Sequence, residues 1–165
     1  MAYVSLADTP TELYHYTKRE NLEKILEDGR IRRFGDRETW FCQSLDDMLE
    51  LMKATVMQEG KPYIKVGGSI GYYPQFVPED YVVLKLTPRW QSGDWIRWMQ
   101  EVPDDSPQEF KDAAYRFSML KVGFRGDLKF QKDPEVIEVA ELLQQDMKAH
   151  APAQDQGMKL SYERV

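Results

Sequence analysis

The chain has few of the residues that bind soft metals or form disulfides. It contains one cysteine, Cys42, and two histidines, His15 and His150. A single cysteine has no partner for an intramolecular disulfide, and these residues together are too few for a zinc site. We therefore expect neither a disulfide nor a metal centre, and we interpret Cys42 as a small buried hydrophobic residue.

Long hydrophobic runs are also missing. No uninterrupted apolar run approaches the ~20 residues that a membrane-spanning helix needs, and Met1 to Pro10 lack a basic, apolar leader. We expect a soluble, cytoplasmic protein with no membrane partner. The 165 residues, 42% of them hydrophobic, suit one domain with its own core. We place this domain at 1–148 and expect a polar extension over 149–165, with a last strand at Met158–Val165 as an alternative.

Positive charge is scarce as well. The formal net charge is −6, so the chain as a whole lacks the basic surface of an extended nucleic-acid groove. The densest basic cluster consists of Arg30, Arg32, Arg33 and Arg37. It is either a set of solvated surface charges or a partner for a pyrophosphate, to which arginine can donate two hydrogen bonds. The glycines between 67 and 71 fit no phosphate-binding fingerprint, and we assign them to a loop.

The start of the chain is its most regular part. Leu13–Tyr16 is apolar and β-prone, which predicts a short strand ending near His15. Thr17 and Glu20 form a capping box, so a helix is predicted to begin at Thr17 and to end at Gly29.

A second strand and helix are expected after a loop over 30–38. The strand spans 39–42, and Ser44 with Asp47 gives the capping signal of the helix. Apolar residues at helical spacing extend that helix to Val56.

In the middle of the chain, the composition of 60–78 predicts a long surface loop, and that of 81–87 predicts a central strand. A helix is expected after it, with Ser106 as the cap and Pro107 at the first helical position.

The last part of the chain is harder to assign. Strands are expected over 117–122 and 124–130, separated by Gly123. Asp133-Pro134 favours a helix start, whereas Val136–Val139 fits a strand equally well, and both remain open.

The first third of the chain resembles a known family. Leu13-Tyr14-His15-Tyr16-Thr17, followed by Thr39-Trp40-Phe41-Cys42-Gln43-Ser44, is similar to the amino-terminal signature of the His-type ADP-ribosyltransferases. These include the poly(ADP-ribose) polymerases, diphtheria-type toxins, DarT-like enzymes and rifampin ADP-ribosyltransferases. The resemblance implies an α+β domain in which split antiparallel β-sheets are surrounded by helices, with NAD as the co-substrate.

The resemblance also implies roles for single residues. In the family a histidine hydrogen-bonds the nicotinamide-side ribose, and an aromatic residue stacks on the nicotinamide. His15 matches the histidine, and Trp40 stands where the family usually has tyrosine. Stacking survives this change, but a tyrosine hydroxyl would be lost. Tyr16, Thr17 and Ser44 are expected nearby, and Arg32 is the expected pyrophosphate contact.

A carboxylate completes the family's site by steadying the ribose 2'-hydroxyl and the developing cation. We expect Glu138 in this role because of its late position and the strand composition around it. If a helix begins at Asp133-Pro134, Glu138 would lie in that helix and point elsewhere. The role would then pass to another acid or to none. The other acids considered are Asp127, Asp133, Glu101 and Glu163.

Three functions follow from the resemblance. The leading one is transfer of ADP-ribose from NAD to a macromolecular or small-molecule acceptor, in a toxin or phage effector. An NAD-dependent RNA 2'-phosphotransferase is a second candidate, which the overall acidity disfavours. The third is a catalytically inert relative that binds a partner protein or a nucleotide in the same cleft.

Overall fold

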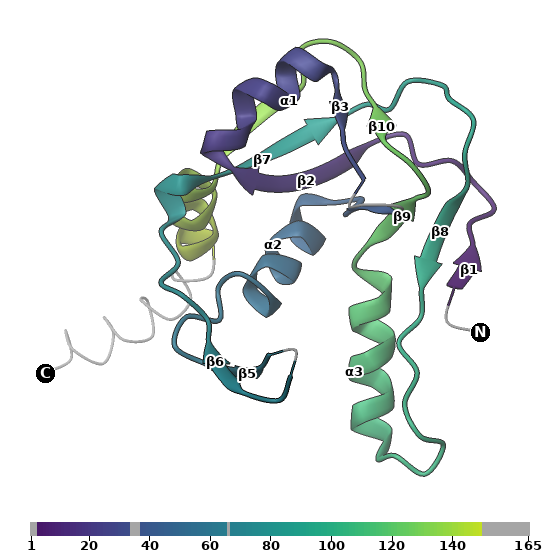
Figure 1. Cartoon of the computed structure of the whole chain (residues 1–165), viewed down its shortest axis with the longest axis vertical. Helices are drawn as coiled ribbons and strands as arrows, with labels where there is room; N and C mark the ends of the chain where they lie inside the picture. Colours follow the sequence, from purple (N-terminus) through teal and green to yellow (C-terminus); the bar gives the residue numbers. More distant parts are fainter. Residues whose placement is uncertain (1–2, 34–36, 66, 150–165) are drawn as a thin grey trace, which may run out of the picture.

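The structure is a computed structural model that describes residues 3–33, 37–65 and 67–149 (Figure 1). It is an α+β fold with several antiparallel sheets and four α-helices in the described residues, which confirms the expected fold class at this level. No helix in these residues is both long and apolar enough to cross a membrane.

The first sheet has three strands, in the order β11 (Glu135–Glu138), β7 (Tyr81–Leu86), β2 (Leu13–Lys18). β7 is the central strand, as predicted, and both of its neighbours pair with it in antiparallel register. Side chains alternate between the two faces of such a strand; Val82, Leu84 and Leu86 are buried on one face of β7, and Val83 is buried on the other. This explains why its sequence is an almost continuous apolar run rather than an alternating one.

The second sheet has four strands, in the order β1 (Tyr3–Ser5), β8 (Trp95–Trp98), β9 (Val122–Phe124), β4 (Thr39–Phe41). It meets the first sheet where β4 approaches β2. Tyr14 and Cys42 exchange both backbone hydrogen bonds there, with N···O distances of 2.7 and 2.9 Å. In the described residues, backbone pairing therefore joins the two sheets at this one residue pair.

Helices cover both faces of the first sheet (Figure 1). α1 (Leu22–Asp28) contributes Leu22 and Ile25 to one core cluster, which includes the fully buried Leu13, Leu84 and Leu86. α2 (Leu45–Ala54) and a helix over 139–149 pack on the opposite face, in the cluster around Met52 and Val83. Each fully buried side chain of this size contributes about 1.5 to 3 kcal/mol by leaving water.

The remaining elements are short. β3 (Arg30–Ile31) pairs with β10 (Leu128–Lys129), and β5 (Pro62–Ile64) pairs with β6 (Ile70–Tyr72). 3₁₀ turns occur at Arg19–Asn21 and Pro78–Asp80. α3 (Gln108–Met119) leads into β9 and projects from the second sheet (Figure 1).

The predicted helix start at Thr17 is wrong. β2 continues to Lys18, which pairs with Tyr81, and α1 begins at Leu22 after the 3₁₀ turn. Ladder hydrogen bonds to β7 hold Thr17 in extended conformation, and this tertiary pairing overrides the local capping signal. The end of the helix is as predicted, because Gly29 adopts the left-handed conformation with φ of 65°.

Three predicted loops or strands also differ from the structure. The expected loop over 30–38 contains β3, and the expected loop over 60–78 contains the β5–β6 hairpin. The expected strand over 117–122 is helical as far as Met119, because α3 continues through it. The strand β8 was not predicted, since its tryptophans and Arg97 give it no apolar run.

The last part of the chain resolves one open alternative. Glu135–Glu138 forms β11, and the helix follows it over 139–149 instead of starting at Asp133-Pro134. The expected cap at Ser106 is absent, because Pro107 is the residue before α3 and no side chain caps its first turn. The expected strand at Met158–Val165, like most of the extension, lies outside the described residues.

Gly123 was expected to separate two strands but lies within β9, opposite Trp40. A Cβ at this position would approach Cζ3 of the Trp40 indole to 2.8 Å, closer than ordinary packing allows. The absence of a side chain therefore lets the indole lie flat across the strand.

Gly123→Ala is expected to lower the free energy of unfolding by about 1 to 3 kcal/mol, because the rigid indole must shift. Denaturant unfolding measures this loss. Gly71→Ala is the matched control, because its Cβ would first meet the flexible end of Lys65. Equal stability changes in the two variants would contradict the packing of Trp40 on Gly123.

Candidate functional site

The two sheets separate just beyond the Tyr14–Cys42 pair, and His15 spans the gap. In an antiparallel ladder the next pair of this type would join Tyr16 to Trp40. No backbone hydrogen bond joins these two residues in the described part of the chain. Instead, Nδ1 of His15 lies 3.0 Å from the carbonyl oxygen of Trp40. The strands diverge here and leave the Trp40 carbonyl without a backbone partner. The His15 side chain takes the place of that partner.

This hydrogen bond fixes the tautomer of His15. A carbonyl oxygen only accepts, so Nδ1 carries the proton and Nε2 keeps a lone pair. The ring is half-buried and packs on Phe41, with 5.4 Å between ring centres. Burial lowers the pKa of His15 below its ordinary value, although the bond to Trp40 opposes this shift. His15 is therefore neutral at pH 7 and offers Nε2 as a hydrogen-bond acceptor.

Tyr16 offers backbone groups beside this acceptor. The N–H and C=O of Tyr14 point toward β4, and strand alternation directs those of Tyr16 to the same side. Because β4 has moved away there, the N–H and C=O of Tyr16 open into the gap. The Tyr16 ring packs against Tyr81, and its hydroxyl lies 3.5 Å from the hydroxyl of Thr55.

A hollow of about 390 Å³ occupies this gap. Its lining brings together four of the predicted site residues: His15, Tyr16, Arg32 and Trp40. We call it the His15 cleft. Residues for which the sequence predicted no role in a site complete it: Ile31, Glu38, Thr39, Phe41, Met48, Leu51, Thr55 and Lys121. Most of the exposed area of this lining is apolar, as is usual for a small-molecule site, although half of its residues are polar or charged.

A lysine covers the aromatic wall of the cleft. Nζ of Lys121 lies 5.0 Å from the centre of the Trp40 indole and 5.3 Å from that of the Phe117 ring. A cation at this distance is attracted to the face of an aromatic ring. Lys121 is half-buried, and this burial lowers its pKa because water is excluded from the ammonium.

The structure does not place Glu138 in this lining. Glu138 ends β11, on the far side of β7 from β2, and forms an ion pair with Arg19. Arg19 holds the pKa of Glu138 below its ordinary value. Among the described residues, Glu38 is the carboxylate that lines the cleft. It is half-buried directly before β4 and accepts a hydrogen bond from the Tyr3 hydroxyl at 3.3 Å.

The other predicted residues lie at the rim of the cleft or outside it. Arg32 lies at the rim of the cleft, where its Nε donates to Asp28 at 2.9 Å. Ser44 caps α2 by accepting from the backbone N–H of Asp47 at 3.0 Å, and it is not part of the lining. Thr17 lies two residues beyond His15 on β2 and is also outside the lining.

Two further groups bear on the chemistry of the site. Cys42 is fully buried beside the Tyr14 bridge, and burial raises its pKa to about 12, so its thiol is not a nucleophile at neutral pH. Within the described residues, no cluster of three or more histidine, cysteine or acidic side chains is arranged to hold a metal ion.

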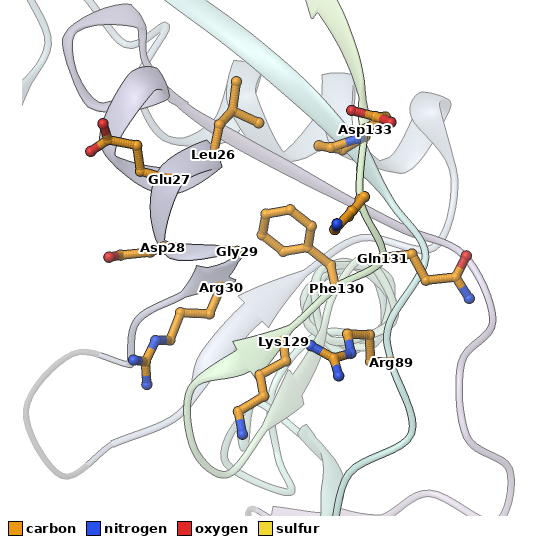
Figure 2. Close-up of a pocket in the computed structure, with 12 residues that line it drawn as sticks. Leu26, Glu27, Asp28, Gly29, Arg30, Arg89, Lys129, Phe130, Gln131 and Asp133 are labelled. Atoms are coloured by element: carbon orange, nitrogen blue, oxygen red, sulfur yellow. The ribbon is translucent and has the colours of Figure 1, made fainter.

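A larger hollow, of about 670 Å³, lies elsewhere (Figure 2). It follows α1 and is bordered by β10 and the chain leading to β11. Figure 2 shows Arg30, Lys129 and Arg89 along one side of it, and Glu27, Asp28 and Asp133 also line it. Charges of both signs line this hollow, and Asp133 is the one residue there that was considered from the sequence as an alternative acid.

Comparison of the chain with protein-family models, with curated proteins and with solved structures found no match.

Glu38 and Lys121 were missed for the same reason. Each directly precedes a strand of the second sheet, Glu38 before β4 and Lys121 before β9. A charge next to a predicted strand is a weak signal, because most such charges are solvated. Only the strand order, which places β9 beside β4, brings Lys121 to Trp40.

Ser44→Ala is expected to lower the free energy of unfolding by about 1 kcal/mol, because the helix loses its amino-terminal cap. Thermal or denaturant unfolding measures the change. Ser44→Asp, which preserves an acceptor at the cap, is expected to restore most of the stability. If the alanine variant is as stable as the original protein, Ser44 does not stabilise α2 as a cap.

The pH dependence of stability tests the buried state of His15. Its pKa in the native state lies below the unfolded value of 6.5, so the unfolded chain binds the proton first as the pH falls. The stability that neutral His15 contributes is therefore complete above that value and is lost progressively as the pH falls toward the native pKa.

His15→Asn keeps an N–H near the Nδ1 position but does not titrate. We expect its free energy of unfolding to fall less than that of the original protein between pH 7 and about pH 5.5. Denaturant unfolding at both pH values measures this difference. The same loss in both proteins would show that His15 does not titrate with a lowered pKa.

Proposed function

We propose that this protein binds NAD in the His15 cleft and transfers its ADP-ribose group to an acceptor, within an ADP-ribosyltransferase-like fold. The observation that carries the proposal is the pairing of His15 with Trp40. It presents a neutral imidazole acceptor beside an aromatic wall, where the two sheets part. The split arrangement of the antiparallel sheets also supports it.

The backbone of Tyr16 matches the carboxamide of nicotinamide. A carboxamide offers one C=O and an NH₂, and the open N–H and C=O of Tyr16 complement both. Such a pair of backbone bonds orients a flat ring without needing a charged side chain. The nicotinamide ring would then lie against Trp40, which supplies stacking area.

Nε2 of His15 is the natural acceptor for a hydroxyl of the adjoining ribose. The neutral state matters here, because an imidazolium would offer a donor instead and would place a positive charge beside the reacting sugar. The lowered pKa keeps this acceptor available at neutral pH.

The reaction breaks the bond between C1' of the ribose and the nicotinamide nitrogen. Its electron pair stays on nicotinamide, which leaves as a neutral molecule, and positive charge develops on the ribose. A carboxylate stabilises this charge in the transition state more than in the ground state. Glu38 is the described carboxylate in the cleft, and we assign it this role in place of Glu138.

A catalytically inert nucleotide-binding protein is the second candidate, and Lys121 favours it. Its ammonium lies over Trp40, so the pyridinium ring of NAD must displace it or use the other face of the indole. A nearby cation also opposes positive charge on the ribose. The same ammonium attracts phosphates, so it favours binding of a nucleotide over cleavage.

Calorimetry with NAD and an assay of nicotinamide release test the proposal. His15→Asn preserves the contact with Trp40 but lacks Nε2. We expect it to bind NAD about tenfold more weakly, since one hydrogen bond of about 1.4 kcal/mol is lost. If this variant binds NAD with unchanged affinity, His15 does not contact NAD.

Glu38→Gln separates the enzyme from the inert binder. We expect NAD affinity within about twofold of the original and turnover lowered by about 10²-fold or more. Glu138→Gln is the matched control and is expected to retain both. If Glu138→Gln alone loses turnover, the acid is Glu138. If the original protein binds NAD without releasing nicotinamide, the inert binder is the correct function.

A further inference from the structure

A second hollow, of about 450 Å³, adjoins the His15 cleft. It shares Glu38, Trp40 and Lys121 with the cleft, and these three residues form the boundary between the two. Its other lining residues are Tyr3, Arg37 and Trp98. Three of the six lining residues are therefore aromatic and two are cationic. We call it the Trp98 hollow.

The register of the second sheet explains why these side chains meet. Tyr3 pairs with Trp98 across β1 and β8, and paired residues in antiparallel strands share a face. Extending the β8–β9 register by two residues places Lys121 opposite Trp98. Trp40 lies on the same face through its pairing with Gly123. The aromatic rings and Lys121 thus form a continuous surface across four strands.

The charge of this surface differs from that of the whole chain. Lys121 contacts two aromatic rings, and no ion pair joins it to an acid among the described residues. Arg37 is exposed at the edge of the hollow, and the Arg125 guanidinium lies 5.7 Å from the centre of the Tyr3 ring. A protein with a net charge of −6 thus carries a local cationic and aromatic surface beside its cleft.

We propose that the Trp98 hollow binds one nucleotide, with its base stacked on Tyr3 and Trp98 and its phosphate at Lys121. This inference rests on the proposed function, and it makes the bound nucleotide the acceptor of ADP-ribose. Stacking on aromatic side chains combined with cations along the phosphate is how proteins hold unpaired nucleotides. With a volume of about 450 Å³ and one half-buried cation, Lys121, the hollow suits a mononucleotide or one unit of a single strand rather than an extended duplex.

Glu38 connects the two hollows in the reaction. A nitrogen or hydroxyl of the bound nucleotide donates an electron pair to C1' of the ribose as the bond to nicotinamide breaks. The acceptor loses its proton to the Glu38 carboxylate, which then passes it to water. Nicotinamide keeps the electron pair of the broken bond, so no oxidant or further reactant is needed.

Binding is tested with two probes that distinguish the sources of a nucleotide. Fluorescein-labelled single-stranded DNA and RNA octamers of mixed sequence are followed by anisotropy, and the nucleoside 5'-monophosphates by calorimetry. We expect Trp98→Leu and Tyr3→Leu each to weaken binding by about tenfold, the effect of losing one stacked aromatic ring. Tyr3 lies at an exposed edge strand, so its variant tests the hollow with little risk to folding.

The matched control is Trp90→Leu, because Trp90 is 94% exposed and lies outside the hollow. It is expected to bind both probes as the original protein does. Affinity for the octamers falls as the salt concentration rises, and Lys121→Gln is expected to make this dependence less steep. The slope of log affinity against log salt concentration should become smaller in magnitude by about 0.7, the effect of losing one phosphate contact on a single strand. Binding of octamers but not monophosphates assigns the hollow to a strand, and binding of both assigns it to free nucleotides.

NAD affinity of the same variants separates this inference from the proposed function. If Trp98→Leu lowers the affinity for nucleotides and leaves the affinity for NAD unchanged, the hollow is a separate nucleotide site. This conclusion holds even if the protein transfers no ADP-ribose. A parallel loss of NAD affinity would show that the hollow holds the second half of NAD, which overturns the inference. No binding of either probe to the original protein would overturn it as well.

Discussion

The site depends on the single backbone pair between Tyr14 and Cys42 that joins the two sheets. Because this pair is not followed by another, the strands part and leave polar backbone groups that need partners. His15 satisfies one of them, the Trp40 carbonyl, and so orients its own ring. The N–H and C=O of Tyr16 are the groups that we propose for the ligand. The geometry of the cleft is therefore a consequence of where the ladder stops, and the buried side chains of Cys42 and Tyr14 hold this point in place.

The charges around the cleft work in opposite directions. Glu38 can stabilise positive charge on a ribose, whereas Lys121 attracts phosphate and opposes that charge. Both lie at the boundary with the Trp98 hollow, so in the proposed function the same two residues would act on NAD, on the transition state and on the second ligand. A nucleotide phosphate at Lys121 would neutralise the ammonium and remove its opposition to charge on the ribose. If the proposed function holds, an acceptor bound at Lys121 would thus favour the cleavage of NAD.

Sequence patterns predicted the parts of the fold that local chemistry determines. The end of α1 at Gly29, the cap of α2 at Ser44 and the central strand β7 follow from residues that are close together in the chain. The patterns failed where long-range pairing decides: Thr17 belongs to a strand because β7 pairs with it, and β8 forms because β9 and β1 flank it. The site shows the same division. The sequence predicted His15, Tyr16, Arg32 and Trp40, and all four line one cleft. The order of strands in the sheets brings Glu38 and Lys121 to this cleft and keeps Glu138 away from it, and no local sequence pattern predicts that order.

The tautomer of His15 is the central claim, since the carbonyl of Trp40 fixes it and the proposed ribose contact needs it. Nitrogen-15 NMR of histidine-labelled protein distinguishes the two ring nitrogens, and the His15→Asn variant assigns the resonances of His15. The account predicts a protonated Nδ1 and an unprotonated Nε2 at pH 7, with the Nε2 resonance shifting when NAD is added. A proton on Nε2, or an Nε2 resonance that saturating NAD leaves unchanged, would contradict it.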